Sequence, residues 1–137
     1  MGDDADSLVG ALRRRFPAAR LIEGGAQAEA LAARVAGAIE TPSRGLDLPL
    51  DIRGTAFQRR VWEALCEIPT GTTSSYAEIA RRIGAPGAVR AVAQACAANP
   101  VAVAVPCHRV VRSDGALSGY RWGAGRKRVL LTREAEA

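Results

Sequence analysis

Apolar side chains recur every three or four positions over three stretches between residues 55 and 98, which is the spacing of one face of a helix. The pattern predicts helices over residues 55–68, 75–83 and 88–98. Pro69 and the glycine-containing segment 84–87 end the first two of them. The positions expected to face the core are Phe57, Val61, Trp62, Leu65, Ile79, Ala80, Ile83, Val89, Val92, Ala93 and Cys96.

The first two of these helices each begin with a capping box, in which two side chains satisfy the free N–H groups of the first turn. The pairs are Thr55 with Gln58 and Ser75 with Glu78. The second and third helices, joined by a tight turn, show the helix-turn-helix pattern, whose second helix enters a groove of nucleic acid. Arg90 lies near the start of that helix. An ordinary helical hairpin would show the same pattern.

Residues 1–45 are rich in alanine and arginine and are expected to form helical pieces. One piece should begin at Asp6 or Ser7, and another should cover residues 29–39. Residues 19–22 could form a short strand between them. The apolar positions of the two helices are Leu8, Val9, Leu12, Phe16, Leu31, Val35, Ala38 and Ile39.

A proline-interrupted linker separates these pieces from the rest of the chain. The expected division is an N-terminal part at residues 1–45, the linker at 46–54 and the main domain at 55–137. The last helix of the main domain is predicted over residues 126–135. Its inward positions are Val129 and Leu130.

Residues 101–105 are an unbroken run of valine and alanine, which predicts a short buried strand. Pro106 would end that strand, because proline has no N–H to donate. Cys107 follows, directly before His108, the only histidine in the sequence. Adjacent side chains on extended backbone point to opposite sides, so a proton would pass between these two through a water molecule or a bend. A buried cysteine beside a capped histidine is the alternative interpretation.

Two polar segments follow this run. Residues 112–115 should form a turn that reverses the chain, as the wing hairpin of a winged helix-turn-helix does. Residues 118–123 contain two glycines and two aromatic residues, and they are suited to form one wall of a pocket.

The composition indicates a globular protein. The sequence has 137 residues, 48% of them hydrophobic and 24% charged, which is enough for one domain with a core. Its N-terminus is acidic and it has no apolar run long enough for a membrane span, so a cytoplasmic protein is expected. The three cysteines predict neither a disulfide framework nor a zinc or other metal site. Cys66 and Cys96 are expected in the core.

The charge is unevenly distributed. Residues 51–137 carry 13 Arg and Lys against 7 Asp and Glu, a net charge of +6, whereas residues 1–50 carry 6 against 7, a net charge of −1. Such asymmetry is typical of a surface that binds a polyanion, although basic residues also form ordinary solvated faces.

A cysteine beside a histidine suggests nucleophilic chemistry, because the thiolate is the reactive form and the histidine can take the proton. A histidine in this role needs a third group to orient it, and Glu134 is the candidate carboxylate. These three residue types would equally suit a thiol hydrolase.

The signature Pro106-Cys107-His108-Arg109-Val110, with Asn99-Pro100 before it and the loop from Ser118 to Gly123 after it, resembles the active-site region of the O6-alkylguanine-DNA alkyltransferases. The similarity is greatest to the C-terminal domain of the bacterial adaptive-response methyltransferases and covers roughly residues 46–137. It implies a mostly helical α/β fold, a winged helix-turn-helix-like alkyltransferase domain. Residues 1–45 resemble only the latter part of the family's N-terminal subdomain, so they are expected to be a truncated remnant or a helical cover.

The resemblance assigns roles to residues of this chain. Cys107 matches the alkyl acceptor, His108 the base that acts through a water molecule, and Glu134 the carboxylate that orients the histidine. Asn99 matches the asparagine that ties the recognition helix to the active-site turn, and Tyr76 the tyrosine that helps rotate the nucleotide and assists the departing guanine. The residues implied at the DNA are Arg90, as the finger that fills the vacated stack, with Ala91, Ala95 and Tyr76. The implied pocket residues are Val110, Ser118, Gly119, Tyr120, Arg121 and Trp122.

The activity implied is repair of double-stranded DNA by a single, irreversible transfer of an alkyl group from O6 of guanine, and from O4 of thymine, to Cys107. The base is flipped out of the duplex first. No cofactor is implied, and the protein is expected to act as a monomer. Two alternatives remain, a non-catalytic alkyltransferase-like lesion binder and the thiol hydrolase. The presence of Cys107 argues against the first, and the helix-turn-helix with its basic surroundings argues against the second.

Overall fold

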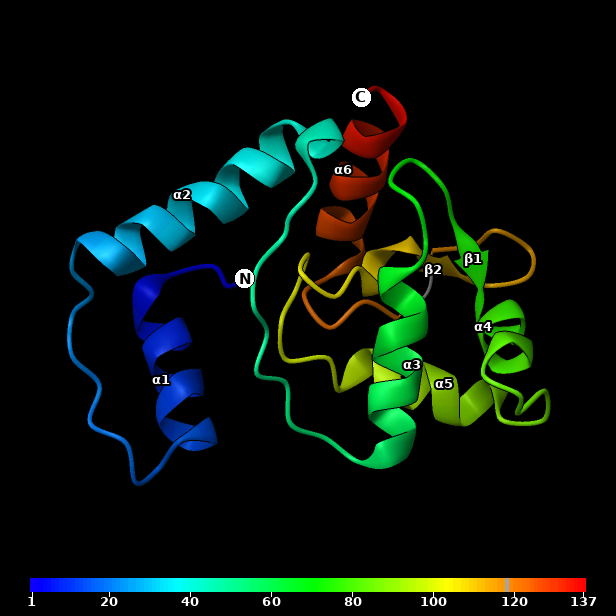
Figure 1. Cartoon of the computed structure of the whole chain (residues 1–137), viewed down its shortest axis with the longest axis horizontal. Coiled ribbons are helices and arrows are strands. Elements are labelled where there is room, and N and C mark those ends of the chain that lie inside the picture. Colours follow the sequence, from blue (N-terminus) through cyan, green and yellow to red (C-terminus); the bar gives the residue numbers. More distant parts are fainter. Residues whose placement is uncertain (118) are drawn as a thin grey trace.

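Helices α3 (Ala56–Cys66), α4 (Tyr76–Arg82), α5 (Val89–Ala97) and α6 (Ala124–Ala135) form the body of the protein (Figure 1). The computed structural model describes residues 1–117 and 119–137, so the predicted pocket residue Ser118 lies outside the described residues. The four helices confirm the helices predicted over this half of the chain. The core between them contains Val61, Trp62, Leu65, Ile68, Ile79, Val92, Cys96, Val105, Val110 and Leu130.

Both predicted capping boxes are present. The Thr55 hydroxyl accepts from the N–H of Gln58, whose side chain accepts from the N–H of Thr55, and α3 begins at the next residue. Ser75 and Glu78 form the same reciprocal pair at the start of α4. Each box satisfies two backbone donors that the first turn would otherwise leave open, which is why both helices begin where the sequence predicts.

The turn between α4 and α5 is tight. Gly84 has a φ of 75°, in the left-handed region that glycine enters without steric cost, and the N–H of Ala85 donates to the carbonyl of Ala80 at 2.9 Å. Helix α5 then begins at Val89, so Arg90 is exposed in its first turn. The two helices pack on each other and on α3, as a helix-turn-helix requires.

A two-stranded parallel sheet connects this unit to the segment that bears Cys107. Strand β1 (Ser74–Ser75) pairs with β2 (Val110–Val111), with Ser74 opposite Val110. The predicted turn at residues 112–115 is present, closed by a hydrogen bond of 2.8 Å from Gly115 N to the carbonyl of Arg112. The chain reverses there as predicted, and Arg112 N also donates to the carbonyl of Ala116 at 3.2 Å, but within residues 1–117 and 119–137 no returning strand pairs with β2, whose partner is β1.

The strand predicted over residues 101–105 is wrong. This run folds back on itself: the N–H of Val105 donates to the carbonyl of Val101 at 3.0 Å, and Val103 has a φ of 72°. Of the five residues only Val105 is fully buried. A run of β-branched residues forms a strand only where it pairs with another strand, and the N–H groups of Val101 and Val105 instead donate to the Asn99 side chain and to the carbonyl of Val101.

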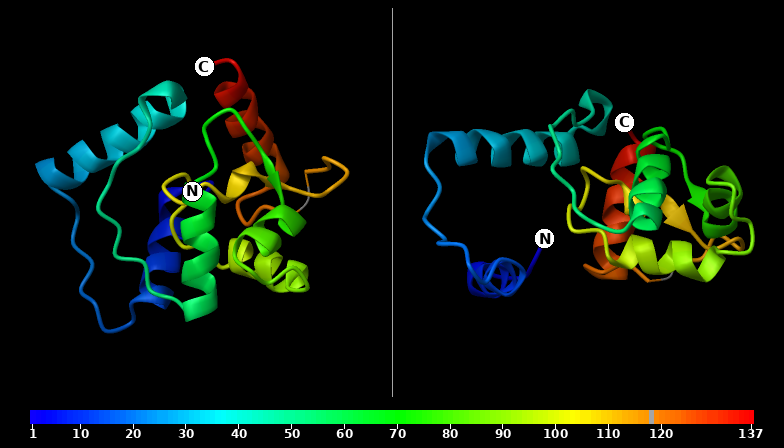
Figure 2. Two further views of the ribbon diagram at one scale, coloured as in Figure 1. Left: turned by 45° about the vertical axis from the view of Figure 1, so that its right-hand side comes forward. Right: turned by 60° about the horizontal axis from the view of Figure 1, so that its bottom comes forward.

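The N-terminal helices lie to one side of the body (Figures 1 and 2). Helix α1 (Ala5–Arg15) and helix α2 (Ala26–Glu40) confirm the helical prediction for this part, whereas residues 19–22 form a turn and irregular backbone rather than a strand. The cap of α1 is Asp4, whose carboxylate accepts from Ser7 N at 2.7 Å, and not Asp6 or Ser7. The end of α2 and the short 3₁₀ helix η1 (Pro42–Arg44) contact α6.

Three residues predicted to face the core are exposed instead. Cys66 is exposed at the last position of α3, Val89 is 38% exposed at the first position of α5, and Val129 is 50% exposed. Two of these residues occupy terminal turns, where a helix leaves the surface it packs on. On α6 the inward stripe is Lys127, Leu130 and Glu134, which places Val129 on the opposite face.

Candidate active site

Asn99 is the centre of the hydrogen-bonding network around Cys107. It lies just beyond the end of α5 and is fully buried. Its Nδ2 donates to the carbonyl of Val105 at 2.8 Å and to Sγ of Cys107 at 3.1 Å, and its Oδ1 accepts from Val101 N at 2.9 Å. The Asn99 side chain therefore links residues 101–105 and Cys107 to the end of α5. The family resemblance implied this linking role for Asn99.

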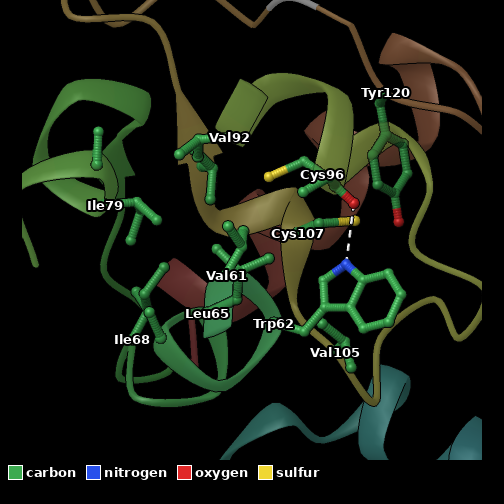
Figure 3. Close-up of a cluster of buried hydrophobic side chains, with 14 of the residues drawn as sticks. Val61, Trp62, Leu65, Ile68, Ile79, Val92, Cys96, Val105, Cys107 and Tyr120 are labelled. Atoms are coloured by element: carbon green, nitrogen blue, oxygen red, sulfur yellow. Dashed lines mark hydrogen bonds between the residues drawn. The ribbon is translucent and has the colours of Figure 1, made fainter. Parts of the chain in front are cut away.

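Cys107 is buried, with 4% of its surface exposed, at the start of the 3₁₀ helix η2 (Cys107–Arg109). Figure 3 shows it beside Trp62, Cys96 and Tyr120 in the core. Burial raises the pKa of this thiol, and the hydrogen bond from Asn99 and the charge of Lys127 partly offset that rise. The resting sulfur is therefore a protonated thiol at neutral pH, and a base is needed to make it a nucleophile.

His108 and Glu134 form that base and its orienting group. The ring Nε2 lies 2.7 Å from Oε1 of Glu134, and both side chains are buried. The second ring nitrogen, Nδ1, is buried and has no hydrogen-bond partner among the residues that the structure describes. Because the carboxylate engages Nε2, Nδ1 is the nitrogen that remains for proton exchange with another group.

Burial raises the pKa of Glu134, but hydrogen bonds and charges from His108 and Arg109 outweigh it and bring the pKa to about 2. Arg109 donates from Nε to Oε2 at 2.9 Å and from its terminal nitrogen to Oε1 at 2.9 Å. The carboxylate is therefore ionised throughout the neutral range, and its orientation is fixed on both oxygens.

Arg109 is a site residue to which the sequence assigned no role. Besides holding Glu134, its guanidinium donates to the carbonyl of Ile68 at 2.7 Å and to the hydroxyl of Thr70 at 3.1 Å. It thus joins η2 and α6 to the loop after α3. Arg109 stands in the Pro-Cys-His-Arg signature, so the sequence could have marked it as a site residue. The signature does not show which groups Arg109 contacts.

Lys127 was missed as well. Only 1% of its surface is exposed, and its Nζ donates to the carbonyl of Val110 at 2.5 Å. Burial lowers the pKa of this ammonium, whereas charge interactions with Cys107 and Cys96 raise it. A cation placed within electrostatic reach of the nucleophile favours its thiolate form. The sequence could have indicated Lys127, because the spacing of Lys127, Leu130 and Glu134 places all three on one face of the last helix.

An open groove lies between the helix-turn-helix and the segment after β2. We call it the α5 groove, and its lining residues are Tyr76, Gly87, Val89, Arg90, Ala93, Ala97, Arg112, Gly119, Tyr120 and Arg121. The structure thus brings Tyr76 and Arg90, predicted at the DNA, to one surface. Ala95 was also predicted there, but it is buried in the core with its carbonyl accepting from Trp62 Nε1 at 2.9 Å. Ala91 is partly buried and lies outside the lining.

Among the described pocket residues, Gly119, Tyr120 and Arg121 line the α5 groove, and Val110 is buried behind it. Trp122 packs edge-on against Tyr120, with ring centroids 5.3 Å apart. Burial raises the pKa of Tyr120, and its hydroxyl is buried with no hydrogen-bond partner among the described residues. Cys107 is not part of the groove lining, but it belongs to the same buried core cluster as Tyr120, which does line the groove.

Within residues 1–117 and 119–137, no three His, Cys, Asp or Glu side chains come together as a metal site would require. In the same ranges, none of the helices combines the length and the apolar character of a membrane span.

Comparisons with known proteins agree with this geometry. Residues 56–136 match the family model described as "6-O-methylguanine DNA methyltransferase, DNA binding domain". The chain is 56% identical over 135 residues to the regulatory protein ada of Salmonella typhimurium, covering 98% of this chain and 38% of that protein. It is 46% identical over 125 residues to the inducible methylated-DNA–protein-cysteine methyltransferase of Bacillus subtilis, covering 91% and 70%. The chain therefore spans well under half of the Salmonella relative.

A solved structure supports the same grouping. The crystal structure of Mycobacterium tuberculosis OGT in complex with DNA aligns with a TM-score of 0.71 and 50% sequence identity, covering 78% of this chain and 67% of that one. The helical body with its small sheet is thus an alkyltransferase-type fold.

Proposed function

The chain belongs to the 6-O-methylguanine DNA methyltransferase family, and from that membership we propose that it repairs alkylated DNA by direct reversal. In this proposal the alkyl group on O6 of guanine, or on O4 of thymine, moves to Sγ of Cys107. The observation that carries the proposal is the environment of this thiol: Asn99 donates to it, the adjacent His108 pairs with Glu134, and its core neighbour Tyr120 lines a groove beside the helix-turn-helix.

The first step is activation of the thiol. Because burial raises the pKa of Cys107, it must lose its proton to a base as it reacts. Adjacent residues of a 3₁₀ helix point about 120° apart, so the proton passes to Nδ1 of His108 through a water molecule. The ionised Glu134 stabilises the imidazolium that forms, as the carboxylate of a catalytic triad does.

The second step is a single displacement. The S–C bond forms as the C–O6 bond breaks, and the bonding electron pair stays on the guanine oxygen. Tyr76, at the mouth of the site on α4, donates a proton to the departing base. His108 then releases to solvent the proton that it took from the thiol, and Tyr76 takes one up from solvent. The net change moves one proton from the thiol to guanine, so no cofactor or co-reactant is needed.

The product is a thioether, which no base in this site can cleave. Each molecule therefore reacts once. Before reaction the nucleotide must leave the duplex, at a cost of a few kcal/mol in stacking and pairing. Arg90 at the rim of the α5 groove is placed to enter the vacated stack and offset part of that cost.

We also propose a domain organisation, an oligomeric state, a cellular location and a mode of DNA binding. Residues 55–137 form the catalytic and DNA-binding domain, residues 46–54 a linker, and residues 1–45 an N-terminal subdomain. The protein acts on double-stranded DNA as a monomer in the cytoplasm. DNA binding is chiefly electrostatic and tolerant of sequence, because the basic half of the chain supplies phosphate contacts.

The test is intact mass after incubation with duplex DNA containing O6-methylguanine. One added methyl group, mapped to Cys107 by peptide sequencing, supports the proposal. The matched controls are Cys66→Ser and Cys96→Ser, which should still gain one methyl. A methyl on Cys96, or transfer by a Cys107→Ala variant, would refute the assignment. Tight lesion binding without any transfer would favour the lesion binder, and hydrolysis of thiol-protease ester substrates would favour the hydrolase.

A further inference from the structure

A second groove adjoins the α5 groove and shares one wall with it. It lies between α1 and the loop that follows β2, and we call it the α1 groove. Its lining includes Leu12, Arg14, Arg15, Pro100, Arg121 and Trp122. Arg121 lines both grooves, so the two grooves meet at this residue.

Arg121 is held at this junction from two sides. Its guanidinium carbon lies 5.5 Å from the centre of the Trp122 ring, and its NH1 donates to the carbonyl of Asn99 at 3.1 Å. The second contact connects the junction to the residue that holds Cys107. Arg121 thus connects the α1 groove to the α5 groove, and its hydrogen bond to the carbonyl of Asn99 connects the α1 groove to the surroundings of Cys107.

The far wall of the α1 groove is strongly basic. The last turn of α1 carries three exposed arginines, of which Arg14 and Arg15 line the groove and Arg13 lies outside the lining. The ion pairs found among residues 1–117 and 119–137 involve none of these three. The acidic residues of α1 are at its other end, where Asp4 caps the helix and Asp3 pairs with Arg126. The positive charge at the groove is therefore not neutralised within the described structure.

The placement of α1 fits this chemistry. In Figures 1 and 2 it lies beside the end of the body that carries α5, away from the C-terminus of α6. A duplex seated on the α5 groove would extend beyond the width of that helix on either side. The positive charge of the α1 groove complements the negative phosphates of a DNA strand that continues from the α5 groove past Arg121.

We propose that the α1 groove binds the sugar-phosphate backbone of duplex DNA flanking the lesion, an inference that rests on the proposed function. Arg14 and Arg15 contact phosphates, because their planar guanidinium groups match phosphate oxygens in two hydrogen bonds. Leu12 and Trp122 form an apolar floor against the deoxyribose. Residues 1–45 thereby take part in DNA binding, although the basic excess lies in the other half of the sequence.

The test compares two double variants that each remove two positive charges. Arg14→Ala with Arg15→Ala removes the groove arginines, and Arg13→Ala with Arg20→Ala removes exposed arginines outside the lining. Affinity is measured against salt on undamaged duplexes of about 30 and about 10 base pairs, roughly three turns and one turn. The groove variant should bind the longer duplex about 10- to 100-fold more weakly at about 0.1 M salt, with a salt slope smaller by about 2.

The control variant should lose less than about threefold, since it removes no phosphate contact. Replacing Arg14 and Arg15 with lysine keeps both charges and should restore most of the affinity for the longer duplex. Equal binding by the groove and control variants, or no recovery with the lysine pair, would overturn the inference. Methyl transfer from duplex DNA containing O6-methylguanine to Cys107 of the wild-type protein tests the proposed function separately. If that transfer is absent, the proposed function fails, whatever the two grooves bind.

Discussion

Asn99 donates one amide hydrogen to Sγ of Cys107 at 3.1 Å and another to the carbonyl of Val105 at 2.8 Å, so a single buried side chain sets both the turn before the nucleophile and the environment of its sulfur. The two residues belong to segments that meet only because the chain folds back between them. Stability and reactivity are therefore coupled at this residue.

Replacing Asn99 with Ala should lower both quantities. The change leaves the buried carbonyl of Val105 and the partly buried N–H of Val101 without their partner, which should cost about 3 kcal/mol in the free energy of unfolding. Urea unfolding measures the loss. Gln94→Ala, an exposed position on the same helix, is the control and should change stability by less than about 0.5 kcal/mol. Equal stability of the two variants would show that the network contributes nothing.

Replacing Glu134 with Gln should slow alkyl transfer by about 100-fold or more, since the histidine loses the charge that stabilises its protonated form. Single-turnover rates on free O6-benzylguanine measure this without involving DNA. Glu136→Gln, exposed near the end of the same helix, is the matched control. A rate equal to that of the control would remove Glu134 from the mechanism.

The same carboxylate makes stability depend on pH. Its pKa is about 2 in the folded protein against an ordinary 4.5, so the unfolded chain binds the proton more readily. Its contribution is complete above pH 4.5 and is lost as the pH falls from there towards 2. The wild-type melting temperature should therefore drop more steeply over this range than that of Glu134→Gln. Parallel curves would contradict the depressed pKa.

Lys127→Met should shift the reaction to higher pH. The ammonium favours the thiolate of Cys107, so removing its charge should raise the pKa of that thiol. The pH–rate profile on free O6-benzylguanine would then rise at higher pH than in the wild type. Arg128→Ala, exposed at the neighbouring position, should leave the profile in place. A lower rate with an unshifted profile would show that Lys127 acts only by holding Val110.

Arg90→Ala should slow transfer from duplex DNA by about tenfold more than it weakens binding, because a side chain that fills the vacated stack acts after binding. Transfer from the free base should be unchanged in rate. Arg82→Ala, exposed on α4, is the control for an ordinary phosphate contact. If the loss in rate on duplex merely equals the loss in affinity, Arg90 is a phosphate contact and not the finger.

The sequence by itself determined the helices of the body and the residue types of the chemistry. Helix α4 follows from Ser75, Glu78 and a short apolar stripe, all within one or two turns, and the structure confirms both its cap and its buried face. The signature around Cys107 was specific enough to indicate the family. Such features are local, because helical spacing and capping depend on residues three or four positions apart.

The tertiary structure decided everything that depends on distant partners. His108 and Glu134 are 26 residues apart, and Arg109 reaches the carbonyl of Ile68 across 41. Residues 101–105 have the composition of a strand, yet they fold back on themselves because the N–H of Val101 donates to Asn99 and the N–H of Val105 donates to the carbonyl of Val101. A backbone hydrogen bond goes to whichever partner the completed fold brings near it, and no local pattern contains that information.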